Sequence, residues 1–317
     1  MDRAFSRVLV PSRFHVESHG CIFPFWGFGF IMPGMHALDN TPIIFSDLDG
    51  TLLDHDTYGF VPALPALSMI KEKQIPLVLT SSKTLTEIIG LRRDLENAHP
   101  FIAENGSVVG IPPDYFPGFG PTENGFKMAS GIWVKCMGGN REEVLATLNQ
   151  LRDDHGFPFE GFADMSPARL AGVTGLSEKG ASLARERLST EPILWQGTGE
   201  QWKGFTRELS KTGLGWVQGG RFISISRPFD KKDGVELLLD LYQTHCQVIP
   251  LTIGLGDSPN DKAMLDMMDT AVVIRSGQSD RIIPDGPGTV IRTTRKGPEG
   301  WQEAMDEIFK KGGIYGG

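Results

Sequence analysis

Short apolar runs alternate with amphipathic stretches along the chain from residue 41 onward. Apolar runs this short are typical of strands that are buried on both faces of a parallel sheet. The stretches between them carry apolar residues at helical spacing; Val235, Leu238 and Tyr242, for example, recur at i, i+3 and i+7. The alternation predicts an α/β fold built on a doubly wound parallel sheet. The strands are expected at residues 43–45, 76–80, 101–103, 251–255, 271–274 and 289–291, and the helices at 63–73, 84–96 and 234–245.

The middle of the chain has a different pattern. Residues 112–125 are rich in proline and glycine, which indicates a linker. A strand at 133–137 follows, and helical stretches then mix with short strands up to residue 226. We therefore expect an inserted α+β domain at 119–227, within a core formed by residues 41–118 and 228–317.

Residues 1–40 form an N-terminal extension outside this pattern. Prolines and glycines interrupt its aromatic stretch at 21–35, so it lacks the continuous apolar run of a signal peptide or a membrane span. Three interpretations stay open: a disordered or loosely docked tail, a lipid-contacting segment, or residues upstream of a true start at Met32 or Met35. We expect the extension to be dispensable for folding.

Composition narrows the class of protein. The formal net charge is −8, and nucleic acid or an anionic membrane would need a basic surface instead. The widely spaced Cys21, Cys136 and Cys246 form neither a disulfide framework nor a metal-ligand spacing. The sequence therefore predicts a cytoplasmic protein that binds neither nucleic acid nor membrane, and it leaves the oligomeric state open.

Two acidic motifs follow predicted strands directly. Residues 47–51 (DLDGT) follow the first strand, and residues 256–261 (GDSPND) follow the strand at 251–255. The carboxyl ends of parallel strands share one edge of the sheet, where ligands bind in open α/β folds. Carboxylates gathered there repel one another unless they are protonated or hold a cation. A set of ligands made only of oxygen favours Mg²⁺ over zinc.

Two weaker signals lie near these motifs. Residues 80–84 (TSSKT) end the second strand and begin a helix, where free N–H groups and hydroxyls can hold a phosphate. Taken alone they are equally typical of an ordinary helix cap. Lys231 and Lys232 precede the helix at 234–245 and could balance the carboxylates, although a lysine pair is commonly just solvated.

Together, and in this order, the four motifs resemble those of the haloacid dehalogenase (HAD) superfamily of phosphotransferases. The resemblance implies that Asp47 is the nucleophile, which forms an aspartyl phosphate, and that Asp49 is the acid/base. It implies that Ser81 holds the phosphate and that Lys231 pairs with the nucleophile and the phosphate, with Lys232 as the alternative. The implied fold is a Rossmann-like HAD core with an inserted cap.

The resemblance also implies a Mg²⁺ site. Asp257 would bind the ion together with Asp47 and the main-chain carbonyl of Asp49, and Asp261 would support these ligands. Magnesium and lysine would both offset the charge of the transferring phosphoryl group.

The long insertion resembles the cap of the Cof-type sugar phosphatases, and several short strings resemble the mannosyl-3-phosphoglycerate phosphatases. These strings include residues 81–84 (SSKT), 104–106 (ENG), 111–117 (IPPDYFP) and 219–222 (GGRF). A glycerate carboxylate needs a cationic partner, which Lys83, Arg187 or Arg221 could supply, and Glu191 could accept sugar hydroxyls. The substrate-binding residues expected on this basis are Ser82, Lys83, Glu104, Asn105, Arg187, Glu191 and Arg221.

The expected activity is a Mg²⁺-dependent hydrolysis of mannosyl-3-phosphoglycerate to mannosylglycerate and phosphate. The first alternative is a HAD sugar-phosphate phosphatase of broader specificity, of the sucrose-phosphate or Cof type. The second is a Mg²⁺- or phosphate-binding regulator without catalysis, which the acid/base Asp49 argues against.

Overall fold

The computed structural model describes residues 41–120, 125–219, 221–286 and 288–310. The expectations for residues 1–40, and for Cys21 within them, lie outside the described residues. Among the described residues, no helix is both long enough and apolar enough to cross a membrane.

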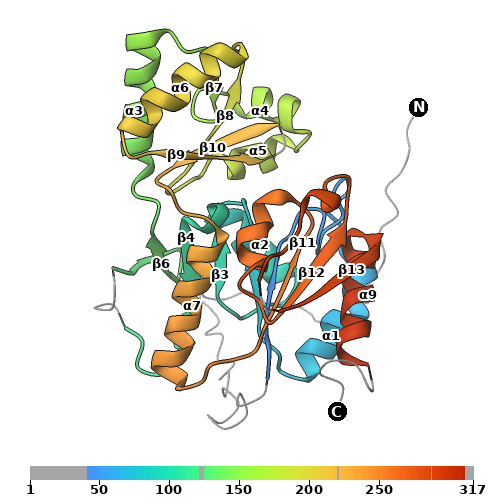
Figure 1. Cartoon of the computed structure of the whole chain (residues 1–317). Helices are drawn as coiled ribbons and strands as arrows, with labels where there is room; N and C mark the ends of the chain where they lie inside the picture. The colour runs from blue at the N-terminus through green and yellow to red at the C-terminus, as the bar shows by residue number, and fades with distance from the viewer. Residues whose placement is uncertain (1–40, 121–124, 220, 287, 311–317) are drawn as a thin grey trace, which may run out of the picture. The chain divides into compact units, whose positions relative to one another are not determined.

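Within the described residues, the larger of two sheets has nine strands and carries the α/β pattern expected from the sequence (Figure 1). Its order is β13-β12-β11-β1-β2-β3-β4-β6-β5. Neighbours pair in parallel from β13 to β3, and in antiparallel from β3 to β5. The strands are β1 (Ile43–Ser46), β2 (Leu77–Thr80), β3 (Phe101–Ala103), β4 (Val108–Ile111), β5 (Lys127–Ala129), β6 (Ile132–Cys136), β11 (Thr252–Gly256), β12 (Thr270–Arg275) and β13 (Thr289–Lys296).

Helices cover both faces of this sheet, because its central strands are apolar on both sides. Ile253 and Leu255 of β11 belong to an apolar cluster with α1 (Leu64–Glu72), α2 (Leu85–Asp94) and α9 (Gly297–Phe309). Gly254, between them, faces Leu265 and Met268 instead, at and just beyond α8 (Lys262–Leu265). The same alternation sets Ile102 of β3 against α7 (Lys231–Cys246). The helices α1, α2 and α9 therefore lie opposite α7 and α8.

The smaller sheet has four antiparallel strands in the order β7-β8-β10-β9, and with its helices we call it the cap. An apolar cluster joins α3 (Arg141–His155) and α6 (Gly199–Lys211) to this sheet through Phe205 and Ile225. A second cluster joins α4 (Pro167–Thr174) and α5 (Glu178–Ala184) to Phe222. The strands are β7 (Phe159–Gly161), β8 (Glu191–Trp195), β9 (Gly215–Gly219) and β10 (Phe222–Ser226).

The expected start of the inserted domain at residue 119 needs correction. The strand expected at 133–137 is β6, which pairs with β4 and β5 in the larger sheet. The two strands join that sheet because β4 would otherwise expose its unpaired edge. The chain leaves the larger sheet only after Cys136, and returns to it after Ser226 through α7.

Candidate active site

The acidic motifs meet at the carboxyl edge of neighbouring strands. Asp47 follows β1 and Asp257 follows β11, and these two strands pair in parallel at the centre of the larger sheet. The backbone N–H of Asp47 donates to the carbonyl of Leu255 at 2.9 Å, which continues the strand pairing into the site. The sheet topology therefore brings together the carboxylates of Asp47 and Asp257, which are 210 positions apart in the sequence.

Lys231 lies between two of these carboxylates. Its Nζ donates to Asp47 Oδ1 at 2.5 Å and to Asp261 Oδ1 at 2.6 Å, and its side chain is 1% exposed. Burial lowers the pKa of Lys231, but Asp261 and Asp47 raise it by more, so the net shift is upward and the ammonium stays charged. Lys232 is half-exposed and pairs with Glu236, so Lys231 is the lysine of the site.

The local sequence explains why Lys231 points inward. The Asp230 side chain caps α7 by accepting from the N–H of Lys232 at 2.8 Å. The Asp233 side chain in turn accepts from the N–H of Asp230 at 2.7 Å. This capping box starts the helix at Lys231. Gly106 packs against the same point, where a Cβ would lie 1.7 Å from the carbonyl oxygen of Asp230, so only glycine fits.

The three buried or half-buried carboxylates form an oxygen cluster. One carboxylate oxygen from each of Asp47, Asp257 and Asp261 lies within 4.8 Å of the others. Asp261 is further fixed because its Oδ2 accepts the N–H groups of Asp257 at 3.0 Å and Ser258 at 3.1 Å. Gly50 borders the cluster with φ +83°, and a Cβ there would lie 2.7 Å from Asp257 Oδ2.

The cluster has an excess of negative charge. Burial raises the pKa of Asp47 to about 8; Lys231 opposes this shift, and the Asp261 and Asp257 carboxylates add to it. Burial, followed by the charge of Asp261, raises the pKa of Asp257 to about 6. Carboxylates that resist ionisation at this spacing, with only oxygen donors among them, fit a small divalent cation such as Mg²⁺.

Asp49 lies apart from this cluster and faces Lys83. Lys83 Nζ is 2.8 Å from Asp49 Oδ1 and 4.8 Å from the centre of the Tyr58 ring. Burial lowers the pKa of Lys83, but Asp49 and Glu87 raise it by more. The side chain of Asp49 is thus not a member of the metal cluster, and ligation by its main-chain carbonyl stays a prediction.

A cavity of about 370 Å³ lies over these residues and extends to the cap. From the core it is lined by Asp47, Asp49, Ser82, Lys83, Asn105 and Asp257, among others, and from the cap by Phe162, Leu176, Arg187 and Phe222, among others. The cavity is also lined by residues that no sequence motif singled out, namely His55, Tyr58, Glu87 and Gln278. His55 and Tyr58 could have been expected at the cavity because they lie in the turn directly after the DLDGT motif.

The residues expected to bind phosphate differ in exposure, and Ser81 is not among the described residues that line the cavity. The Ser81 side chain is buried, and its Oγ accepts from the N–H of Lys83 at 3.2 Å. Thr84 caps α2 in a capping box with Glu87. Ser82 is exposed to the cavity, and its carbonyl accepts from Arg187 Nη2 at 2.7 Å.

Glu104 and Asn105 share one turn but have different surroundings. Asn105 lines the cavity, and among the described residues its Oδ1 is buried without a hydrogen-bond partner. Glu104 is fully buried; its carboxylate accepts the N–H groups of Leu188 at 2.7 Å and Thr190 at 2.8 Å, both from the cap. The expectation that Glu104 binds substrate is therefore wrong, because its buried carboxylate is bonded to the cap and holds the cap to the core.

The expected roles of two cap residues, Glu191 and Arg221, also need correction. Glu191 is fully buried, and its Oε2 accepts from Arg141 at 2.6 Å, so it has no open face for a sugar hydroxyl. Arg221 is exposed and donates to the carbonyl of Val173. Among the described residues that line the cavity, neither Glu191 nor Arg221 is present, whereas Arg187 is.

Comparisons with known proteins agree with this fold. Residues 44–115 match the family of haloacid dehalogenase-like hydrolases. A protein of Thermotoga maritima has a similar fold, with a TM-score of 0.60 at 14% identity over 85% of this chain and 98% of that chain. The sucrose-phosphatase of Synechocystis, solved with sucrose and phosphate, gives 0.54 at 13% over 84% and 97%. A HAD subclass IIB sugar phosphatase gives 0.55 at 17% over 84% and 98%.

The chain has a fold similar to that of a haloacid dehalogenase-like hydrolase, and its match to that family lies within residues 44–115. The parallel part of the larger sheet confirms the expected fold class. The HAD motifs of the sequence coincide with the residues that the fold gathers at β1 and β11.

The two lysines at the start of α7 offer a matched pair for testing the candidate site. Lys231→Met removes the only cation that touches Asp47 or Asp261 among the described residues, and should lower the free energy of unfolding by about 3–5 kcal/mol. Lys232→Met changes an exposed pair and should alter it by less than about 0.5 kcal/mol. Urea unfolding measures both; equal effects of the two substitutions would contradict the assignment.

The oxygen cluster also predicts how Mg²⁺ affects stability. The folded-state pKa values of Asp47 and Asp257 lie above the ordinary value near 4. Without a cation, the contribution of these two groups to stability is therefore greatest at low pH and falls as the pH rises to about 8. A cation that binds ionised carboxylates should offset this loss. Mg²⁺ should therefore raise the melting temperature more at about pH 8 than at about pH 5. Asp257→Asn should shrink the rise, and a rise independent of pH would refute the account.

Proposed function

We propose that this protein is a Mg²⁺-dependent phosphomonoester hydrolase that works through an aspartyl phosphate on Asp47. The observation that carries the proposal is the division of the carboxylates into two sets. Asp47 is bound by Lys231 within the oxygen cluster, whereas Asp49 lies outside it and borders the cavity. A nucleophile and a separate acid/base are what a two-step phosphoryl transfer requires.

The first step would transfer the phosphoryl group to the protein. An Asp47 carboxylate oxygen attacks phosphorus, and the bond from phosphorus to the ester oxygen breaks. Asp49 gives its proton to that departing oxygen, so the product leaves as a neutral alcohol. The Lys231 ammonium, fixed at 2.5 Å from Asp47, keeps the carboxylate oriented and offsets the charge that gathers on the phosphoryl oxygens.

The second step would regenerate the carboxylate. Asp49 takes a proton from a water molecule, the water oxygen attacks phosphorus, and the bond from phosphorus to Asp47 breaks to release phosphate. Asp47, Asp257 and Asp261 would hold Mg²⁺, with the Asp49 carbonyl as the further expected ligand. When bound, the ion would supply positive charge that orients and neutralises the phosphoryl group.

The substrate we propose is a phosphorylated sugar–glycerate conjugate, mannosyl-3-phosphoglycerate. Lys83 and Arg187 border the cavity and provide cationic partners for the glycerate carboxylate. The unpartnered Oδ1 of Asn105 is an acceptor for a sugar hydroxyl. The second candidate is a sugar phosphatase of broader specificity, which the similarity to the sucrose-phosphatase and to the subclass IIB sugar phosphatase favours.

A phosphate-release screen tests the proposal. The substrates are mannosyl-3-phosphoglycerate, 3-phosphoglycerate, mannose 6-phosphate and sucrose 6-phosphate, each with Mg²⁺ and with excess chelator. We expect release only with Mg²⁺, and kcat/KM much higher for mannosyl-3-phosphoglycerate, because binding of the remote sugar stabilises the transition state. Asp47→Asn, a far weaker nucleophile, should abolish release from every ester.

Three results would each revise a different part of the proposal. Equal turnover of the simple sugar phosphates would favour the broader phosphatase. Near-normal release by Asp47→Asn would exclude the covalent mechanism. Phosphate binding without release from any ester would favour a regulator on the same fold.

A further inference from the structure

Tyr58 has a backbone conformation that an aromatic residue rarely adopts. Its φ is +57°, in the left-handed region that favours glycine. For a bulky residue this conformation is strained and persists only where the surrounding structure enforces it. Tyr58 lies in the turn that follows the DLDGT motif, between Asp54 and Gly59.

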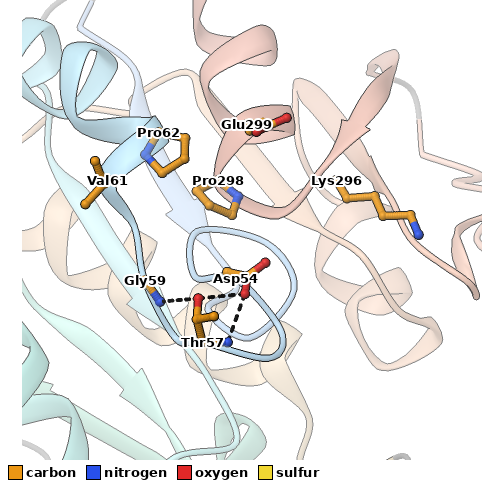
Figure 2. Close-up of a pocket in the computed structure, with 8 residues that line it drawn as sticks. All are labelled: Asp54, Thr57, Gly59, Val61, Pro62, Lys296, Pro298 and Glu299. Carbon is orange, nitrogen blue, oxygen red and sulfur yellow. Dashed lines mark hydrogen bonds between the residues drawn. The ribbon is translucent and has the colours of Figure 1, made fainter. Parts of the chain in front are cut away.

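Hydrogen bonds within the turn hold Tyr58 in this conformation, and those between Asp54 and Thr57 are drawn in Figure 2. Asp54 Oδ1 accepts from the N–H of Thr57 at 2.9 Å and from its hydroxyl at 2.7 Å. The N–H of Tyr58 donates to the Asp54 carbonyl at 2.9 Å, and the N–H of Asp54 donates to the Gly59 carbonyl at 2.8 Å. These bonds involve the backbone and the side chains of Asp54 and Thr57, so the turn does not need the Tyr58 ring to form.

The ring also contributes little to the core. Tyr58 is 41% exposed, far from the burial of an aromatic residue that stabilises a fold. It lines the cavity instead, and the Lys83 ammonium lies 4.8 Å from its centre. A strained residue that is neither buried nor needed by its turn points to a functional role.

The position of Asp49 indicates what the ring meets. Asp49 must reach the ester oxygen of the departing group, so groups beside Asp49 and away from the oxygen cluster surround that departing group. Lys83 contacts Asp49 at 2.8 Å, and Tyr58 lies over Lys83. The departing part of the substrate would thus lie against Tyr58.

We propose that Tyr58 is a specificity-determining residue, whose ring packs against the C–H face of the sugar or sugar-acid that leaves with the ester oxygen. The proposal rests on the phosphatase function argued above. Tyrosine suits this task because its ring offers a large apolar surface with few rotatable bonds. The strained turn keeps the ring at the cavity wall in the absence of substrate, so that binding does not have to order it.

The experiment separates a contact with substrate from a structural role. Tyr58→Gly relieves the strain and removes the ring, Tyr58→Phe keeps the ring without the hydroxyl, and Gln74→Gly is the control. Gln74 has φ +55° and is exposed, in the connection between α1 and β2. For each protein, kcat/KM is measured with the best sugar ester of the screen and with acetyl phosphate, whose departing group is too small to reach the ring, and the melting temperature is recorded.

Tyr58→Gly should lower the ratio of the two kcat/KM values, sugar ester over acetyl phosphate, by about 3- to 10-fold. Its melting temperature should be equal to or above that of the wild type, as for Gln74→Gly. Tyr58→Phe should keep the ratio. An unchanged ratio in Tyr58→Gly, or a fall in melting temperature with equal losses on both substrates, would overturn the proposal. If the wild type releases phosphate from no ester, the phosphatase function itself is wrong.

Discussion

One buried ammonium group pairs with two of the three carboxylates of the site. Lys231 is 1% exposed and binds Asp47 and Asp261 at once, while Asp257 completes the carboxylate cluster. A buried ion pair loses hydration on both sides, so it is retained only where geometry and further hydrogen bonds compensate. Here the backbone N–H groups that bind Asp261 supply those bonds. One ammonium still cannot neutralise three carboxylates, which is why the cluster fits a cation.

The backbone around Lys231 is shaped to keep this arrangement. Gly106 lets the turn after β3 approach the start of α7, and Gly50 lets the turn after β1 approach Asp257. On the face of the sheet that α1, α2 and α9 cover, the ring N–H of Trp301 donates to Ser46 Oγ at 3.1 Å, next to Asp47. Each element that touches the site is thus tied to another that is distant in the sequence.

The same turn after β3 connects the site with the cap. Glu104 accepts N–H groups of the cap segment at Leu188–Thr190, Asn105 faces the cavity, and Gly106 meets α7. Glu104 and Asn105 both have positive φ, at 49° and 57°. This strained turn therefore contacts the cap, the cavity and the start of α7 at Lys231.

Residues whose roles depend on strand ends were predictable from the sequence, whereas those that depend on tertiary contacts were not. Asp47 and Asp257 were predictable because a short apolar run followed by an acidic turn identifies the carboxyl edge of a parallel sheet. The choice between Lys231 and Lys232 was not, because only the start of α7 decides which of them points inward. The charges of Glu104 and Glu191 suggested that they bind a ligand. The cap segments that bury them are distant in the sequence, 84 or more positions from Glu104 and 28 or more from Glu191. Strand β6, and β5 at the edge beyond it, looked like part of the insertion because the pairing of β6 with β4 leaves no local signal.

The central claim is that Asp47 carries the phosphoryl group and that Asp49, lying outside the carboxylate cluster, acts as the acid/base. It is tested most directly by mass spectrometry of the Asp49→Asn protein after brief reaction with a substrate that the wild type hydrolyses, followed by acid quenching and digestion. Without its base, the breakdown of the intermediate should slow more than its formation. The account predicts one added phosphoryl group on the peptide that contains Asp47, absent when Asp47 is also replaced by asparagine. A phosphoryl group on another residue, or free phosphate released at the wild-type rate with no labelled peptide, would contradict it.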